Sequence, residues 1–188
     1  RGPLVYGGRH IPVASLGAAA AERTITVTAT SKAFNTAGLK CAQIIFSNTA
    51  DVHTWNGLTG VAKDGTGTLG VLAAETAYRK CGDFLDEEIA YLRQTRDWLV
   101  EELPQRIPGL KTSKPDATYL LWLDFADTAI GGNPQPAKWL RENAKGALNE
   151  GDTFGTGGPG HARLNFSTSR EILEEALDRM ERAFAALD

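Results

Sequence analysis

The pattern of hydrophobic and polar positions predicts two strands in the first quarter of the chain. Residues 24–30 are nearly all β-branched, and branched side chains fit a pleated strand better than a helix. Residues 41–47 form a mainly apolar run, which is typical of a buried strand. The residues from Ala33 to Gly38 lie between these runs and predict a turn or a short helix that ends at the glycine.

Helical periodicity dominates the middle of the chain. Residues 50–70 are polar and rich in glycine, which predicts a short helix followed by an exposed connection. From Val71 to Leu103, apolar residues recur at helical intervals. We expect a break at Gly82 and an end at Pro104, because proline lacks the N–H that helical hydrogen bonding needs. A helix of this length could connect two domains.

The last third of the chain predicts a mixed layer of strands and helices. Residues 117–125 are apolar and aromatic and predict a strand, and residues 161–167 predict another. Between them, Pro136 marks the start of a helix that we expect to end at Gly151. These elements indicate an α+β arrangement in the carboxyl-terminal part.

A final amphipathic helix gives the clearest signal in the sequence. Thr168 and Glu171 fit a capping box, in which each side chain satisfies the other residue's free backbone N–H. The apolar side chains that follow recur on one helical face, which we expect to pack on the strands at 117–125 and 161–167. This apolar stripe consists of Ile172, Leu173, Ala176, Leu177, Met180, Ala183 and Phe184.

Composition and charge exclude several classes of function. The 188 residues include 20 lysines and arginines and 23 aspartates and glutamates, for a formal net charge of −3, so no basic footprint indicates nucleic acid. No apolar run approaches the roughly 20 residues that span a bilayer, and the amino end does not resemble a signal peptide. We therefore expect no nucleic-acid or membrane partner and a cytoplasmic location. Cys41 and Cys81 stand far apart, which favours reduced packing cysteines over a zinc site or a disulfide.

Glycine-rich and histidine motifs do not support a nucleotide or metal site. Residues 65–70 match G-x-G-x-x-G, but no strand precedes them, so we interpret them as a flexible loop. Residues 151–163 lack the Lys-Ser/Thr end of a phosphate-binding P-loop and predict a loop between a helix and a strand. His10, His53 and His161 are too scattered to predict a metal triad, and we expect no metal.

Lys32 is the first candidate for chemistry. It follows the strand predicted at 24–30, and open α/β sheets bind ligands at the carboxyl ends of their strands. A solvated lysine is the simpler interpretation, but Lys40 lies eight residues further on, and a neighbouring cation favours the neutral, nucleophilic amine. Hydroxyl groups beside Lys32 could also hold a phosphate.

Arg163 is the second candidate. It stands near the start of the strand predicted at 161–167, directly after the glycine-rich loop, so its side chain could reach into a cleft. A guanidinium there would suit a substrate carboxylate, which it can hold through two parallel hydrogen bonds. From spacing alone, a surface arginine is the simpler interpretation.

With these residues identified, the sequence resembles the carboxyl-terminal half of a fold-type I, pyridoxal-phosphate-dependent class I/II aminotransferase. Within that family it most resembles the branch of cystathionine β-lyase type C–S lyases. The resemblance covers nearly the whole chain, and its most specific part is the pattern S-K-x-F-N-x-A-G-L at residues 31–39. The segments that carry it are residues 6–16, 26–43, 73–99 and 157–180.

The resemblance implies a fold and a division into domains. The fold is α/β, with the end of a PLP-transferase large domain followed by a small α+β carboxyl-terminal domain. Residues 1–70 would belong to the cofactor-binding large domain, residues 71–104 to a linking helix, and residues 105–188 to the small domain.

The resemblance also implies a role for each candidate residue. Lys32 would bond to pyridoxal 5'-phosphate as a Schiff base and later move protons at the substrate Cα. Ser31 and Lys40 would contact the cofactor, Lys40 through its phosphate, and Arg163 would bind the α-carboxylate of an amino-acid substrate. Ala29 stands where many relatives have a phosphate-binding serine, so one phosphate contact is weaker or supplied from elsewhere. The enzyme would be a homodimer.

Three functions stay open from the sequence. A C–S β-lyase of the cystathionine β-lyase type is slightly favoured over an aminotransferase, and a catalytically inactive truncated scaffold or interaction domain is the third. In this family, an aspartate that pairs with the pyridinium nitrogen, a phosphate loop and a stacking aromatic residue all lie upstream of the segment like residues 2–8. We therefore expect a carboxyl-terminal fragment that does not turn over substrate by itself.

Overall fold

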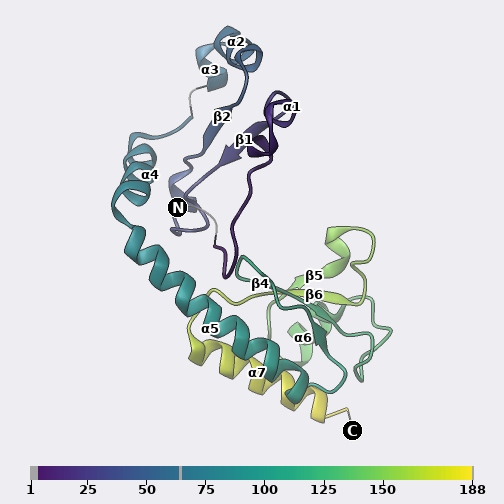
Figure 1. The fold of residues 1–188 in the computed structure, drawn as a ribbon. Coiled ribbons are helices and arrows are strands. Elements are labelled where there is room, and N and C mark those ends of the chain that lie inside the picture. Colours follow the sequence, from purple (N-terminus) through teal and green to yellow (C-terminus); the bar gives the residue numbers. More distant parts are fainter. Residues whose placement is uncertain (1–3, 64, 188) are drawn as a thin grey trace. The chain divides into compact units, whose positions relative to one another are not determined.

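The computed structural model describes residues 4–63 and 65–187, and Figure 1 shows the course of the chain. Two compact units divide it between Glu88 and Ile89, inside one long helix. The first unit contains η1 (Val13–Leu16), α1 (Ala18–Ala21), β1 (Ile25–Thr28), η2 (Ala37–Leu39), β2 (Gln43–Phe46), α2 (Thr49–Gly57), α3 (Gly60–Lys63) and α4 (Thr68–Lys80). The helix α5 (Gly82–Arg106) crosses the boundary. The second unit continues with β3 (Lys111–Thr112), β4 (Leu120–Asp124), α6 (Pro136–Asn143), β5 (Asn149–Glu150), η3 (Gly151–Phe154), β6 (His161–Asn165) and α7 (Arg170–Ala185).

In the first unit, β1 and β2 form a two-stranded antiparallel sheet, in which Ile25 pairs with Phe46. Both predicted strands are confirmed, and each is shorter than the range predicted for it. The expectation that the second strand is buried is wrong. The described residues leave Ile44 and Ile45 40% and 51% exposed. Two strands alone cannot cover apolar side chains on both faces of a sheet.

Two helices, α4 and α5, confirm the predicted helical stretch in the middle of the chain. The break falls at Cys81, one residue before the expected Gly82, because α5 begins at the glycine. The prediction that the helix ends at Pro104 is wrong, since α5 continues to Arg106. Proline removes only its own N–H donor, and so close to the helix end the loss of one hydrogen bond leaves the last turn intact.

The second unit contains a four-stranded antiparallel sheet in the order β3-β4-β6-β5. Side chains alternate along β4 and β6, so that Leu121 and Leu123 are buried together with Ala162 and Leu164. In Figure 1, α6 and α7 lie on the same side of this sheet, and Phe125 stacks on Phe184 of α7. The core of this unit includes Leu92, Leu99, Leu103, Leu121, Leu123, Leu140, Leu164, Phe166, Leu173, Leu177, Met180 and Phe184.

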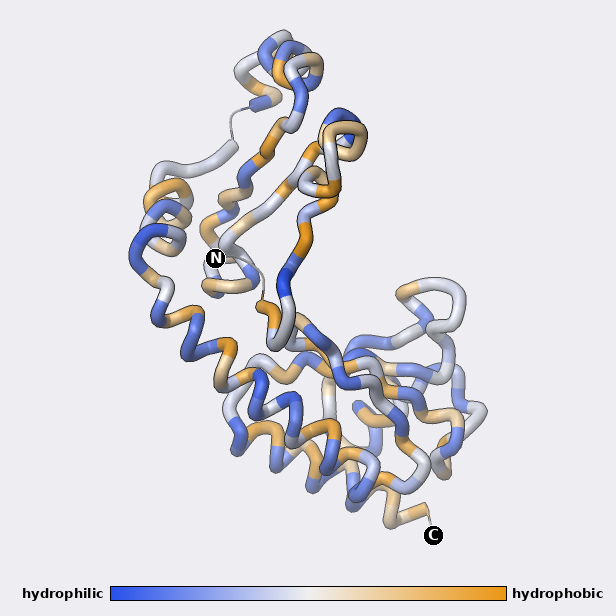
Figure 2. The backbone as a smooth tube through the Cα atoms, in the orientation of Figure 1, coloured by the Kyte–Doolittle hydropathy of each residue, from blue (hydrophilic) through white to orange (hydrophobic). Residues whose placement is uncertain are grey.

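The last helix, α7, confirms the predicted amphipathic stripe, and orange and blue segments alternate along it in Figure 2. Ile172 does not belong to the buried face, because it is 59% exposed. The predicted capping box is wrong, because the helix begins one residue later than expected and its N-cap makes no capping hydrogen bond through its side chain. Ser169 is the N-cap, and its carbonyl oxygen accepts the first helical hydrogen bond from the Leu173 N–H at 3.2 Å. Thr168 instead uses its carbonyl oxygen to accept a hydrogen bond from the Tyr91 hydroxyl at 2.9 Å.

The helix predicted from Pro136 to Gly151 is confirmed at its start and wrong at its end, because α6 ends at Asn143. Lys145 adopts a left-handed conformation with φ 55°, and the N–H of Gly146 donates to the carbonyl oxygen of Leu140 at 3.3 Å. This pairing closes the helix as in a Schellman motif, with Lys145 in the left-handed position that glycine usually occupies. The residues that follow are therefore free to form β5.

Both cysteines are free thiols, with Cys41 buried and Cys81 half-buried, as the sequence predicts. Within residues 4–63 and 65–187, no helix combines the length and the apolar character that a membrane crossing needs. The division of the chain at residues 70 and 104 into a large domain, a linking helix and a small domain stays a prediction.

Candidate functional site

Lys32 lies in a turn that follows β1. The N–H of Phe34 donates to the carbonyl oxygen of Thr30 at 2.9 Å and closes this turn, and Asn35 then adopts a left-handed conformation with φ 50°, which asparagine tolerates well. Lys32 is exposed, and no described residue forms a hydrogen bond or an ion pair with its amine. The turn therefore presents a primary amine that is available to another molecule.

A pair of threonine hydroxyls holds the Lys32 turn in place. Thr30 is 1% exposed, and its Oγ1 lies 2.8 Å from Oγ1 of Thr36 in a shared hydrogen bond. The expectation that hydroxyls beside Lys32 hold a phosphate is therefore wrong for Thr30, because this hydroxyl is buried and already bonded. The half-buried hydroxyl of Ser31 has no partner among the described residues.

Aromatic contacts attach the turn to the helices. Phe34 meets Tyr78 edge to face, with 6.3 Å between the ring centroids, and stacks on Phe84 at 6.4 Å. The Tyr78 hydroxyl donates to Oε1 of Gln43 in β2 at 3.2 Å. The segment that carries Lys32 is thus tied both to α4 and to the neighbouring strand, which restricts the positions that the lysine backbone can take.

Gly70 marks the point where α4 passes the backbone that leads from Lys32 to Lys40. It is buried inside the helix, so the interpretation of residues 65–70 as a loop is wrong for residues 68–70. A Cβ at this position would lie 2.5 Å from the carbonyl oxygen of Leu39, which is closer than non-bonded atoms can approach. Only glycine lets the two backbones approach this closely.

Replacing Gly70 with alanine should destabilise the chain by about 1–3 kcal/mol, because the added methyl group must push back a backbone carbonyl that has no rotamer to change. Urea denaturation of the chain with and without the substitution measures the difference. Gly60→Ala is the matched control, since a Cβ there meets nothing within 4 Å. Equal unfolding midpoints for both variants would contradict this packing role.

Lys40 lies at the other end of the same segment. It caps η2 in a left-handed conformation with φ 49°, and it lines a cavity of about 440 Å³ together with Lys63 and Thr66. Two lysines and a hydroxyl in one cavity suit an anion such as a phosphate. The described lining of this cavity does not include Ser31 or Lys32.

Arg163 lies at the centre of β6 in the second unit, where it pairs with Trp122 of β4 and Asn149 of β5. Its Nη2 donates to Oδ1 of Asn149 at 3.1 Å, and its Cζ lies 4.5 Å from the ring centroid of Phe154. The Nε atom is buried without a hydrogen-bond partner among the described residues. A buried donor without an acceptor is costly, so the guanidinium is ready to accept an anionic partner.

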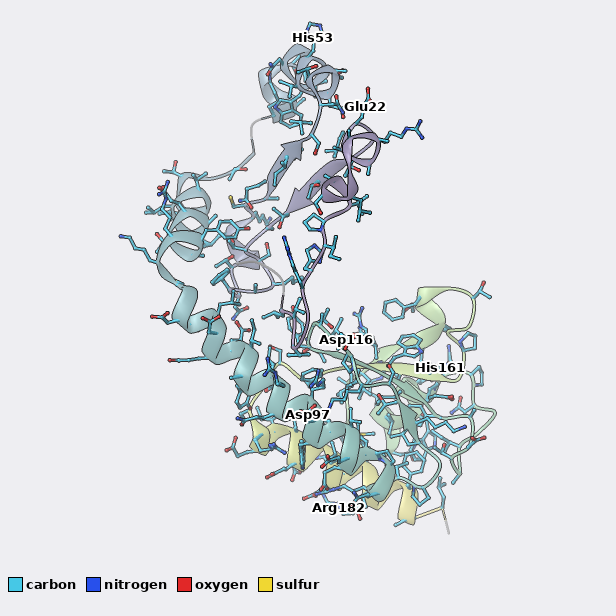
Figure 3. The ribbon with its side chains drawn as sticks, viewed as in Figure 1. Glu22, His53, Asp97, Asp116, His161 and Arg182 are labelled. Carbon is cyan, nitrogen blue, oxygen red and sulfur yellow. The ribbon has the colours of Figure 1, made fainter. Side chains whose placement is uncertain are left out.

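The same face of the sheet carries an aromatic cluster next to Arg163. Trp122 meets Phe154 edge to face at 5.6 Å and stacks on His161 at 5.5 Å. His161, which Figure 3 labels, has its Nε2 atom 3.8 Å from Oδ1 of Asp124. Among the described residues, no group of three or more histidine, cysteine or acidic side chains could hold a metal ion.

The candidate residues thus fall into two groups. Ser31 and Lys32 share one turn, and Lys40 lies eight residues further on in the same unit. Arg163 belongs to the second unit, and its action on the same substrate as Lys32 stays a prediction.

Sequence reasoning missed three residues that surround the candidates. Thr36 bonds the buried hydroxyl before Lys32, and Asn149 and Phe154 contact Arg163. No signal in the sequence indicated Asn149, because it falls inside the helix predicted from Pro136 to Gly151 and lies in β5 instead. Its pairing with Arg163 depends on strand register, which a single sequence does not reveal.

Comparison with known proteins gives the family of this chain. The family described as aminotransferase class I and II matches residues 3–180. A protein named cystathionine β-lyase from Corynebacterium glutamicum is 52% identical over 178 residues, which are 95% of this chain and 47% of that protein. The chain thus spans about half the length of this relative.

Solved structures agree with the sequence comparison. A candidate pyridoxal-phosphate-dependent β-cystathionase from Corynebacterium diphtheriae is 54% identical and superimposes with a TM-score of 0.93, over 97% of this chain and 48% of that one. Cystalysin from Treponema denticola, described as containing pyridoxal 5'-phosphate, is 30% identical with a TM-score of 0.87, over 97% of this chain and 46% of that one. The α/β fold expected from the sequence is confirmed over this half of the structures.

Proposed function

Since the chain belongs to the class I and II aminotransferase family, we propose that the protein carrying it is a pyridoxal-phosphate-dependent C–S β-lyase of the cystathionine β-lyase type. The observation that carries this proposal is the exposed amine of Lys32, which has no partner among the described residues and lies in a hydrogen-bonded turn. This lysine lies in a chain with high identity to a protein that bears the lyase name.

The residues present fit pyridoxal 5'-phosphate. Lys32 supplies a primary amine for the aldehyde of the cofactor, and Lys40 supplies a cation for its phosphate. Ser31, next to Lys32 in the sequence, adds a hydroxyl that has no partner among the described residues. When bound, the cofactor supplies an electron sink that stabilises negative charge at the substrate Cα.

Lys32 and Arg163 would then have separate roles in the reaction. Lys32 would hold the cofactor, and its amine would remove the proton from the substrate Cα. Arg163 binds the α-carboxylate through charge-assisted hydrogen bonds and fixes the orientation of Cα. The Cβ–S bond then breaks and the sulfur leaves as a thiol. For cystathionine and water, the balanced products are homocysteine, pyruvate and ammonia.

An aminotransferase is the second candidate, because the matching family is described by that activity. Lys32 would move the Cα proton and Arg163 would bind the substrate carboxylate in either reaction, so the same two residues would serve both outcomes. We also propose that the protein is a cytoplasmic homodimer. The free thiols of Cys41 and Cys81 support a reducing compartment, and the uncovered apolar side chains of β1 support a larger assembly.

Product analysis tests this proposal. A protein of the relatives' full length that contains this chain should release pyruvate and a free thiol from cystathionine, and the 188-residue chain alone should release neither. The control omits the substrate, and a second reaction supplies an amino acid with 2-oxoglutarate. Glutamate formation without pyruvate or thiol would contradict the lyase and support the aminotransferase.

A further inference from the structure

We infer that Asn149 and Phe154 are positioning residues that hold the Arg163 guanidinium in one orientation for a substrate carboxylate. This inference rests on the proposed function, because it concerns how the arginine of that site is held. The two residues belong to neighbouring short elements, β5 and η3, and they contact the guanidinium in different ways.

Asn149 fixes the guanidinium within its plane. It stands opposite Arg163 in the pairing of β5 and β6, and its Oδ1 accepts a hydrogen bond from Nη2 at 3.1 Å. A carboxamide is a neutral acceptor, so it orients the arginine without cancelling its positive charge. A carboxylate at position 149 would pair with that charge and compete with any anionic ligand.

Phe154 fixes the guanidinium from one face. The Cζ of Arg163 lies 4.5 Å from the centroid of the ring, in the range of a cation–π contact. The ring is itself held by Trp122, which meets it edge to face at 5.6 Å. Phe154 and Trp122 therefore limit rotation of the guanidinium out of its plane.

The glycine-rich segment after β5 explains how Phe154 reaches this position. Gly151 begins η3 and is buried, and a Cβ at this position would overlap the carbonyl oxygen of Gly158. A Cβ at Gly158 would likewise overlap the carbonyl oxygen of Gly151. The two backbones cross without side chains between them, which folds the intervening loop back toward β6. Gly151 and Gly158 thus allow the loop to place Phe154 beside Arg163.

The arrangement leaves most of the donors of Arg163 for a ligand. A guanidinium has five N–H donors, and among the described residues only Asn149 accepts one of them. Arginine side chains lose considerable rotamer freedom when they bind a ligand, so an arginine that is already oriented binds a carboxylate more tightly. Loss of this orientation should raise KM without changing the chemical step.

Three variants of the full-length, cofactor-loaded protein test the inference. Asn149→Ala and Phe154→Leu should each raise KM for the amino-acid substrate by about tenfold, with kcat within about twofold of the parent. Asn149→Asp should raise KM further than Asn149→Ala, because the new carboxylate occupies the arginine. A merely structural role would give the opposite order, since aspartate keeps the acceptor that alanine lacks.

A binding measurement provides a readout that does not depend on turnover. Calorimetric titration with 3-(methylthio)propionate, which has a carboxylate and a thioether but no amino group, should show about tenfold weaker binding to Asn149→Ala. Asn143→Ala is the matched control, because Asn143 is an exposed asparagine of the same unit, and among the described residues its side chain bonds only to the carbonyl oxygen of Trp139. It should bind the probe like the parent.

The outcomes separate this inference from the proposed function. Unchanged KM and unchanged probe binding in both position-149 variants would overturn the role of Asn149, and rescue of binding by Asn149→Asp would overturn it as well. If either of these results is found and Arg163→Ala still weakens probe binding, the positioning role of Asn149 is wrong and the carboxylate role of Arg163 remains. If Arg163→Ala binds the probe like the parent, the carboxylate role of Arg163 fails first.

Discussion

Replacing Lys32 with alanine should abolish the visible absorbance of the lysine-bound cofactor and nearly all turnover. The substitution removes the atom that bonds to the cofactor aldehyde and the base that moves the Cα proton. Loss of a positioned acid–base group alone costs roughly 10²–10⁴-fold in rate. Absorbance spectra of the full-length protein, before and after borohydride, measure the first effect, and pyruvate release measures the second.

The fold should tolerate this substitution. Lys32 is exposed and makes no hydrogen bond or ion pair with a described residue, so the free energy of unfolding should change by no more than about 0.5 kcal/mol. Lys80→Ala is the matched control, because Lys80 is another exposed lysine of the same unit, at the end of α4. A visible band that survives in Lys32→Ala, or disappears in Lys80→Ala, would show that the assigned lysine is wrong.

The second large effect should come from Arg163→Ala. A guanidinium that binds a carboxylate through charge-assisted hydrogen bonds contributes far more than a neutral partner, and removing one member of such a pair costs about 2–5 kcal/mol. We therefore expect kcat/KM for an amino-acid substrate to fall by at least about 30-fold, mainly through KM. Steady-state kinetics of pyruvate release measures both constants.

A lysine at position 163 should recover part of the substrate affinity that alanine loses. Arg163→Lys keeps the positive charge but not the planar pair of donors, so its KM should lie between those of the parent and the alanine variant. Arg141→Ala is the control, since Arg141 is an exposed arginine on α6 without a described partner. If Arg141→Ala raised KM as much as Arg163→Ala, the effect would reflect the net charge of the protein and not a specific contact.

The elements of the fold were predictable wherever a local pattern determines them. The β-branched run before Lys32 predicted β1, and the apolar stripe that includes Leu173 and Leu177 predicted α7, because both signals depend on neighbouring residues only. Element ends were harder to predict. Pro104 lies inside the last turn of α5, and a left-handed Lys145 ends α6 well before Gly151.

The burial of elements was predicted less well than their type. The apolar residues Ile44 and Ile45 indicate a strand with two covered faces, but the described chain supplies only one partner strand. Burial depends on what packs against an element, and that is a property of the tertiary structure and not of a short sequence window. Ile172 of α7 shows the same limit, because it fits the helical period yet lies at its exposed border.

Some residues of the candidate site could be predicted from the sequence and others could not. Lys32 and Arg163 could be proposed from residue type, from their neighbours and from a family resemblance. Thr36, Asn149 and Phe154 could not, because each acts through a contact that exists only after the backbone has folded. Side chains that carry chemistry are easier to find in a sequence than those that hold them in place.

The uncovered sheet of the first unit affects how this chain can be handled in solution. Ile25 and Val27 are each more than half exposed, and Ile44, which pairs with Val27 on the same face of the sheet, is 40% exposed. Apolar surface of this kind promotes self-association. Sulfate and other kosmotropic salts strengthen apolar association, so salting-out steps should precipitate the isolated chain early. Dilute samples in buffers of low ionic strength should keep it dispersed.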